Sequence, residues 1–166
     1  HNCWDPEVRI NEYNKFNTQV QVVCTIPVLF AYFAKAKDGL EVAEFLNDDL
    51  AALVNKYPKK YIGLGTLPMQ SPELAVKELH RIKKIGLKGI QIGSNINNKN
   101  LSESEFFPIW EACEKLDLSV LVHPWNMMGK QDMESYWLPW LVGMPAETSR
   151  AMCSMIFGGV FEKFPN

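Results

Sequence analysis

The sequence predicts an α/β fold, a partial (β/α)8 TIM barrel of about four parallel strand–helix units with a C-terminal helix. Four short apolar segments are bounded by turn residues, which is typical of strands that are buried in a parallel sheet. Helical patterns lie between them, and the predicted strands start 41, 28 and 30 residues apart. This spacing fits a strand, a helix and two loops, the unit that forms parallel sheets with right-handed crossovers.

The predicted strands are read directly from these apolar runs. They are residues 20–26 (VQVVCTI), 61–67 (YIGLGTL), 89–94 (GIQIGS) and 119–123 (SVLVH). Gly63 and Gly65 lie inside the second strand, where glycine indicates close approach of another element. No Gly-rich phosphate fingerprint follows any strand, which argues against a nucleotide-binding doubly wound sheet.

Five helices are predicted around these strands. The first begins at Asp5-Pro6-Glu7 and runs to about residue 16, and the second is residues 40–57, whose apolar residues form one stripe. In the third, Ser71 precedes proline at the first helical position, residues 74–85 follow, and Gly86 ends the helix. The fourth starts at a capping box, residues 102–105, and runs to residue 116, and the last is residues 145–161.

The four units leave two arrangements open. Half of an eight-stranded barrel would leave both outer strands unpaired and the inner face of the sheet in water. An open four-stranded sheet with helices on both faces would avoid this cost. The sequence has no initiating Met and stops at EKFPN after a helix. We therefore favour a single domain, residues 1–166, that is an incomplete portion of a barrel.

Composition limits the class of partner and the compartment. The chain has 166 residues, of which 47% are hydrophobic and 22% charged, and its formal net charge is −2. These values are typical of a soluble globular protein and give no basic surface for nucleic acid. No run is apolar enough to span a membrane, and no signal peptide opens the chain. The cysteines, Cys3, Cys24, Cys113 and Cys153, are scattered, so we expect reduced thiols in the cytoplasm.

His123 is the strongest candidate for chemistry. It ends a predicted buried strand and is followed by Pro124 and Trp125. In parallel α/β folds the carboxyl ends of strands carry the active site, where imidazole binds a divalent metal or transfers a proton. A core histidine with a hydrogen-bond partner is the structural alternative.

The chain contains few partners for such a metal ligand. His80 lies among charges in a helix, where a solvated position is expected, and His1 is terminal. Asp48 and Asp49 fall on the polar face of a helix. No H-x-H, C-x-x-C or H-E-x-x-H pattern occurs, so a conventional zinc site cannot be assembled from these residues alone.

The segment after His123 is long and rich in aromatic residues. Trp125, Trp137 and Trp140 fall within sixteen residues of each other, beside four methionines. This segment could line a substrate pocket, or it could pack as structure. Lys35 and Lys37 could attract an acidic substrate, although a solvated loop is the simpler interpretation.

Several segments together resemble a known family. NCWDPEVR, GLGTLPMQSPELAVKEL, GIQIGS, LVHPW, YWLPWLVGMPAET and CSMIFGGVFEKFP are similar to the 2-amino-3-carboxymuconate-6-semialdehyde decarboxylases of the amidohydrolase superfamily. The resemblance covers essentially the whole chain, and it implies a distorted (β/α)8 barrel with one catalytic zinc. The family acts in tryptophan breakdown through the kynurenine route and tends to form homodimers.

The resemblance also implies roles for individual residues. The four strands would be the second to fifth of the family barrel, so His123 matches a zinc ligand and Trp140 a tryptophan that closes over the substrate. The family's H-x-H pair and a substrate-binding arginine would lie before His1, and the aspartate ligand and the histidine that activates water after Asn166. We therefore expect zinc-dependent decarboxylation by the parent enzyme and an inactive segment.

Two other hypotheses remain open. The chain could be a non-catalytic truncated product that binds or interferes with the full enzyme. It could also belong to a related superfamily decarboxylase or hydratase that acts on another aromatic or muconate acid.

Overall fold

A computed structural model of the chain describes residues 4–166, and His1 and Cys3 lie outside that range. Its centre is a four-stranded sheet in the order β1-β2-β3-β6. All three neighbouring pairs are parallel. The strands are β1 (Gln21–Cys24), β2 (Tyr61–Gly65), β3 (Gly89–Gly93) and β6 (Ser119–His123).

The strands are staggered as a barrel requires. Cys24, the last residue of β1, pairs with Leu64, which pairs with Gly89, which pairs with Ser119, the first residue of β6. The carboxyl end of β6 therefore lies four residues, from Ser119 to His123, beyond that of β1. A (β/α)8 barrel has a shear of about eight over eight strands, so a stagger of about four is expected of half a barrel.

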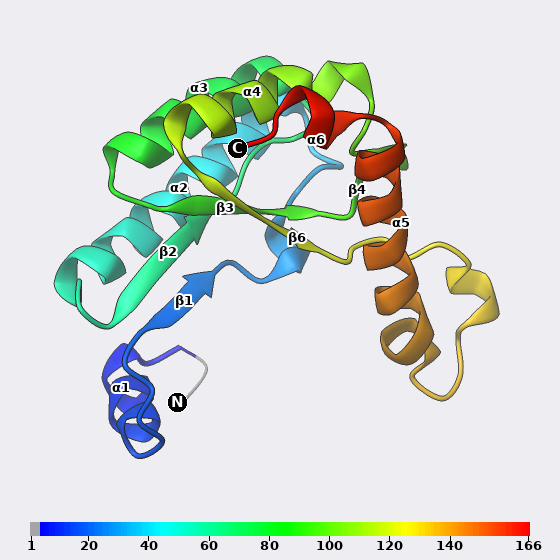
Figure 1. The fold of residues 1–166 in the computed structure, drawn as a ribbon. Helices are drawn as coiled ribbons and strands as arrows, with labels where there is room; N and C mark the ends of the chain where they lie inside the picture. The colour runs from blue at the N-terminus through cyan, green and yellow to red at the C-terminus, as the bar shows by residue number, and fades with distance from the viewer. Residues whose placement is uncertain (1–3) are drawn as a thin grey trace.

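Three helices cover one face of this sheet and form an arch above it (Figure 1). They are α2 (Ala36–Lys56), α3 (Pro72–Lys84) and α4 (Phe107–Leu116). The core lies between them and the sheet and contains fully buried side chains from both layers, including Leu79, Ile82, Ile90, Ile92 and Ile109. Burial of each such side chain contributes about 1.5–3 kcal/mol.

Two further helices lie at the ends of the arch. α1 (Pro6–Asn14) lies beside β1, and α5 (Met144–Phe157) extends from the opposite side (Figure 1). A two-stranded antiparallel hairpin, β4 (Asn95–Ile96) with β5 (Lys99–Asn100), follows β3. The remaining short helices are η1 (Pro27–Leu29), η2 (Ser104–Phe106), η3 (Lys130–Asp132), the π-helix η4 (Pro139–Gly143) and α6 (Val160–Lys163).

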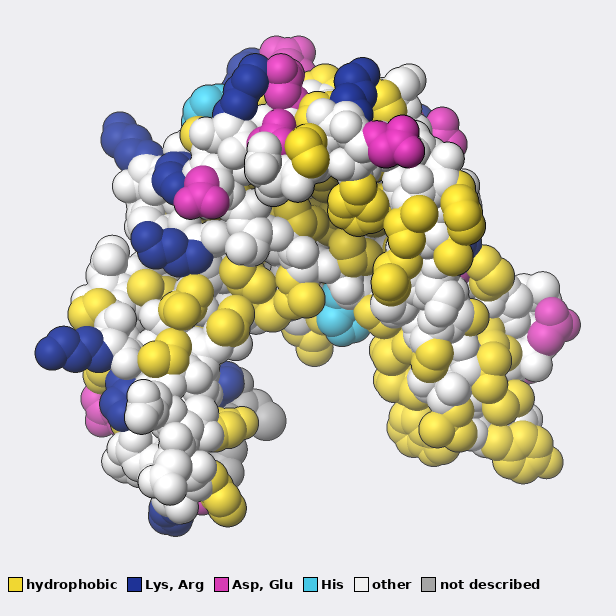
Figure 2. All heavy atoms as spheres, viewed as in Figure 1, with side chains coloured by type: hydrophobic (Ala, Val, Ile, Leu, Met, Phe, Trp, Pro, Cys, Tyr) yellow, Lys and Arg dark blue, Asp and Glu magenta, His cyan; other side chains and the backbone are white. Residues whose placement is uncertain are grey.

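Among residues 4–166, no helix lies over the second face of the sheet, as expected of half a barrel. We predicted four strands that are all buried, but only β3 is buried along its whole length, and β1 and β6 are largely exposed. Val22 is 58% exposed and Leu121 44%, both on the uncovered face. Figure 2 shows hydrophobic side chains lining the hollow beneath the arch. The strands have the apolar composition of a sheet that is covered on both faces, but the helices of residues 4–166 cover only one face.

Most predicted elements are confirmed, with three corrections. The strand Ser119–His123 is found as predicted, and the other three strands are one to three residues shorter. The capping box at Ser102 is wrong: η2 intervenes, and α4 starts at Phe107, ahead of Pro108, without a side-chain cap. The last helix is interrupted at Gly159, which has a φ of +71°. Gly86, with a φ of +93°, ends α3 as predicted.

The two glycines of β2 are explained by close packing. A Cβ on Gly63 would lie 2.6 Å from a Leu87 side-chain carbon, and one on Gly65 would lie 2.8 Å from the Asn47 side chain. The helix layer is therefore in direct contact with the backbone of β2, as the sequence indicated. Within residues 4–166, no helix is both long and apolar enough to cross a membrane.

Candidate functional site

Polar residues gather where the parallel strands end. Thr66 directly follows β2, Ser94 directly follows β3, and His123 is the last residue of β6. Because the carboxyl ends of parallel strands meet at one edge of a sheet, these side chains belong to one rim. The rim is where the sequence predicted the site.

His123 lies on the uncovered face of the sheet. It pairs with Gly93, and two residues earlier Leu121 pairs with Gln91. Side chains alternate along a strand, and Ile90 and Ile92 are part of the core under the helices, so His123 faces the opposite side. Its side chain is partly buried, in agreement with a rim position and not with a core histidine.

The hydrogen bond of the imidazole defines which nitrogen is available. Nδ1 of His123 lies 2.8 Å from the carbonyl oxygen of Pro124. A carbonyl oxygen only accepts, so Nδ1 carries the proton and donates. In the neutral ring Nε2 then keeps its lone pair, and a backbone carbonyl bonded to the other nitrogen is the usual support of a metal-binding histidine.

Three aromatic residues cover the end of β3 beside His123. Phe30 stacks on Tyr32 at 5.3 Å between ring centroids and meets Trp125 edge to face at 6.1 Å. The backbone N–H of Gly93 donates to the Tyr32 hydroxyl at 3.0 Å. Burial raises the pKa of the Tyr32 phenol well above its usual value, so the hydroxyl stays protonated. The cluster fixes the loop after β1 over the rim.

The uncovered face also carries a buried amide that the sequence reasoning missed. Gln91 is 1% exposed, and its Oε1 has no hydrogen-bond partner among the described residues. It lies on the same face as His123, since the register places it level with Leu121. A buried acceptor without a donor is costly, by about 1–3 kcal/mol. A glutamine in an otherwise apolar strand was the signal that could have identified it.

The segment between β6 and α5 forms an open groove of about 820 Å³. Trp137 and Trp140 meet there at 4.9 Å between ring centroids and are 70% and 53% exposed. Tyr136 and Trp137 both have a positive φ, 57° and 60°, which bulky residues rarely adopt. The groove is lined by Lys130, Gln131, Met133, Glu134, Tyr136, Trp137, Pro139 and Trp140. His123 is not in this lining, so the structure does not bring Trp140 and His123 into one cavity.

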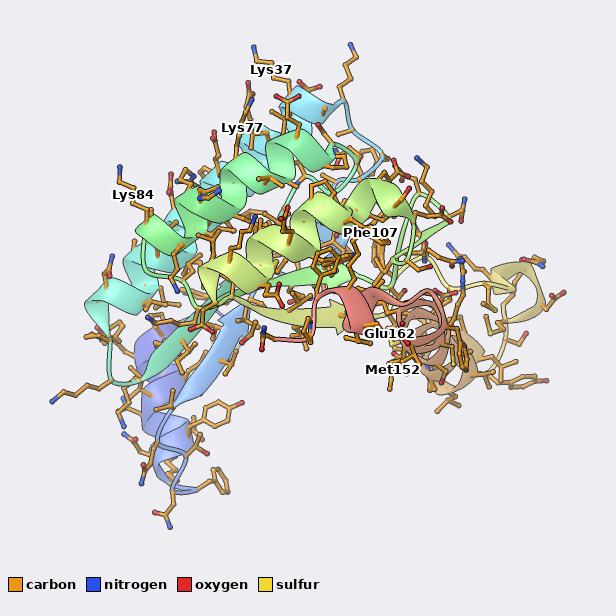
Figure 3. The ribbon with its side chains drawn as sticks, turned by 45° about the horizontal axis from the view of Figure 1, so that its top comes forward. Lys37, Lys77, Lys84, Phe107, Met152 and Glu162 are labelled. Carbon is orange, nitrogen blue, oxygen red and sulfur yellow. The ribbon has the colours of Figure 1, made fainter. Side chains whose placement is uncertain are left out.

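The other residues that the sequence suggested as site candidates do not lie beside His123 at the rim. His80, Lys35 and Lys37 are exposed, as predicted, and Figure 3 shows Lys37 projecting from α2. Asp48 forms an ion pair with Arg81 on the helix layer. Across residues 4–166, no three His, Cys, Asp or Glu side chains are close enough to hold a metal ion.

A buried carboxylate lies behind the rim and was also missed. Glu147, at the start of α5, is 0% exposed and accepts hydrogen bonds from Ser94 and Asn95, which directly follow β3. A glutamate in the first turn of a helix reads as a favourable surface charge, so its burial was not evident from the sequence.

Comparisons with known proteins agree with this architecture. All of residues 1–166 match the family described as amidohydrolase. The chain is 58% identical to 2-amino-3-carboxymuconate-6-semialdehyde decarboxylase from Dictyostelium discoideum, over 99% of this chain and 46% of that protein. It spans about half the length of the curated relatives it matches.

Solved structures of decarboxylases share the fold. 5-Carboxyvanillate decarboxylase LigW from Sphingomonas paucimobilis superposes with a TM-score of 0.88 at 26% identity, over 95% of this chain and 48% of that one. The corresponding enzyme from Novosphingobium aromaticivorans, which has manganese bound, gives a TM-score of 0.86 at 30% identity, over 97% and 48%. The four strands and their helices thus form half of a TIM barrel of the amidohydrolase decarboxylase type.

Proposed function

Because this chain belongs to the amidohydrolase family, we propose that it supplies half of the barrel of a metal-dependent decarboxylase. One observation carries the proposal: 58% of the residues, over 99% of the chain, are those of the Dictyostelium discoideum decarboxylase. The remaining strands of the barrel lie outside residues 1–166 in this proposal. We call these residues together with those strands the complete barrel.

His123 provides one ligand through Nε2, while Pro124 keeps Nδ1 protonated and the ring oriented. The other ligands come from the remaining strands. A divalent ion held by His123 and those ligands would supply Lewis acidity at this rim. We propose zinc, as the family resemblance implies, and manganese is the alternative because it is bound in a relative's structure.

The proposed reaction converts 2-amino-3-carboxymuconate-6-semialdehyde to 2-aminomuconate semialdehyde in tryptophan breakdown. The substrate is a small carboxylate with an extended conjugated chain, and flat aromatic side chains suit such a molecule. From the family resemblance we assign substrate binding to Trp140, although in this structure it lines the groove after β6 and His123 does not. Cys24, Cys113 and Cys153 are free thiols, which supports a cytoplasmic enzyme.

Turnover by the complete barrel tests the substrate. Decay of the conjugated acid's ultraviolet absorbance is expected with zinc present, and His123→Ala is expected to abolish it. A near-normal rate in His123→Ala with the metal retained would refute the role of this residue. Thermal unfolding of the variant serves as the control for misfolding.

A second candidate is a related decarboxylase for an aromatic acid. It is favoured by the likeness to 5-carboxyvanillate decarboxylase. The same assay with 5-carboxyvanillate separates the two, because the enzyme should turn over its own substrate with a kcat/KM several orders of magnitude higher.

A further inference from the structure

The carboxylate of Glu147 is buried and has four hydrogen-bond donors. Oε2 accepts from Ser94 Oγ at 3.0 Å and from Asn95 Nδ2 at 3.1 Å. Oε1 accepts from the Met128 backbone N–H at 2.9 Å and from Arg150 Nη1 at 3.2 Å. Burial of a charged group is costly unless it is paired and hydrogen-bonded, and here both conditions are met.

Ser94 and Asn95 also hold the backbone that directly follows the His123 imidazole. The Ser94 N–H donates to the carbonyl of His123 at 2.9 Å. The N–H of Trp125 donates to Ser94 Oγ at 3.0 Å, and Asn95 Nδ2 donates to the carbonyl of Trp125 at 2.8 Å. Since the Ser94 hydroxyl accepts from Trp125, its own proton is free for the carboxylate of Glu147, the stronger acceptor.

Residues 123–128, which we call the strap, are therefore fixed at three points. Ser94 and Asn95 hold its first half, and Glu147 holds Met128 directly. The strap leads into the groove segment that carries Trp140. Within the part of the chain that the structure describes, Glu147 alone contacts Ser94, Asn95 and the far end of the strap.

We propose that Glu147 is a positioning residue that sets where the His123 imidazole and the groove segment lie. The consequence for metal binding rests on the proposed function, whereas the holding of the strap does not.

Packing alone does not account for this residue. One and two turns further along α5, Ala151 and Met155 attach the helix to the core through apolar contacts. An apolar side chain at residue 147 would serve that purpose without desolvating a charge. Arg150 provides the counter-charge and is tied to the hairpin through Asn100 Oδ1 at 3.1 Å.

Limited digestion with trypsin tests how firmly the strap is held, and this test does not depend on decarboxylase activity. Lys130 is exposed and lies two residues beyond the strap. In Glu147→Gln, the amide N–H₂ replaces one acceptor oxygen and faces groups that are themselves donors, so hydrogen bonds to the strap are lost. The chain near Lys130 should then open more often, and we expect cleavage after Lys130 to be about tenfold faster than in the unchanged protein. The cleavage site is identified by mass spectrometry.

The matched control is Glu162→Gln, which makes the same charge change at an exposed residue of α6 (Figure 3). Its cleavage rate after Lys130 should equal that of the unchanged protein. Ser94→Ala removes one donor and one acceptor and leaves the charge satisfied by three donors, so a smaller acceleration is expected. The proposal would be overturned if Glu147→Gln and Ser94→Ala were both cleaved after Lys130 at the rate of Glu162→Gln.

Metal dependence of the complete barrel provides the second readout. Apo enzyme is titrated with zinc or with manganese, and activity is followed. Loss of a group that orients a metal ligand typically weakens metal affinity by about 10–100-fold, so the metal concentration for half-maximal activity should rise by at least tenfold in Glu147→Gln. A lower maximal activity with an unchanged metal midpoint is the result of a purely structural role, and it would overturn the proposal.

The two readouts separate the failure of each claim. A wild-type enzyme that needs no metal would refute the proposed function and, with it, the link from Glu147 to the metal. Unchanged cleavage after Lys130 would refute the inference about the strap itself.

Discussion

Asn47 joins two helices to the end of β2, and its removal should cost about 3 kcal/mol of stability. It is 1% exposed and lies in α2. Its Oδ1 accepts from the N–H of Thr66 at 2.7 Å, and its Nδ2 donates to the carbonyl of Thr66 at 2.9 Å and to Glu78 Oε1 at 2.6 Å. One side chain thus satisfies both backbone groups of the residue that begins the rim after β2.

The magnitude follows from what Asn47→Ala leaves without partners. The N–H and C=O of Thr66 would be buried and unpaired, at about 1–3 kcal/mol each. Glu78 keeps hydrogen bonds from Arg81 Nε and Nη2, at 2.8 and 2.9 Å, so its charge stays compensated. Alanine returns about 0.6 kcal/mol through its higher helix propensity. The net loss is therefore about 1.5–5 kcal/mol, a large part of the 5–15 kcal/mol typical of a domain.

Urea unfolding followed by circular dichroism measures this loss. Asn55→Ala is the matched control, because Asn55 is exposed on the same helix and the chemical change is identical. We expect the control to be neutral or stabilising by a few tenths of a kcal/mol. The reasoning fails if Asn47→Ala destabilises the protein by less than about 1 kcal/mol relative to Asn55→Ala.

Three further predictions concern the helix layer. Leu79 is 0% exposed, so Leu79→Ala should lower the free energy of unfolding by about 2–5 kcal/mol, measured in urea, and a loss below about 1 kcal/mol would contradict its place in the core. Gly86→Ala should cost about 1–2 kcal/mol from backbone strain alone, because nothing lies within 4 Å of the added Cβ, and a neutral substitution would contradict the positive φ. Burial raises the pKa of the Cys113 thiol to about 12, so it stays protonated in the folded protein at about pH 9, where an unfolded cysteine ionises. Iodoacetamide at that pH should alkylate exposed Cys153 and leave Cys113 unmodified until the protein unfolds, and equal labelling of both in the folded protein would contradict its burial.

The parallel sheet was predictable because its signals are local. The strand Ser119–His123 is an apolar run between turn residues, and Gly86 directly follows a helical pattern. His123 could be identified for the same reason, because the apolar run directly before it shows that it lies at the end of a strand. The interruption of the last helix was missed because apolar residues continue on both sides of Gly158 and Gly159.

The support of the site could not be predicted from local patterns. Glu147 meets Ser94 and Asn95 across 53 and 52 residues of sequence, and no periodicity connects them. The exposure of β1 and β6 follows from half a barrel but could not be inferred from their own residues, for a related reason. Their side chains have the composition of strands covered on both faces, whereas the covering of a face depends on elements elsewhere in the fold.

The most direct test of the central claim is the metal content of the complete barrel and of its His123→Ala variant. Both proteins are dialysed and analysed by inductively coupled plasma mass spectrometry. If His123 Nε2 is a ligand, the unchanged enzyme holds about one divalent ion per chain and the variant retains far less. A His123→Ala variant that keeps one tightly bound ion per chain would contradict the account.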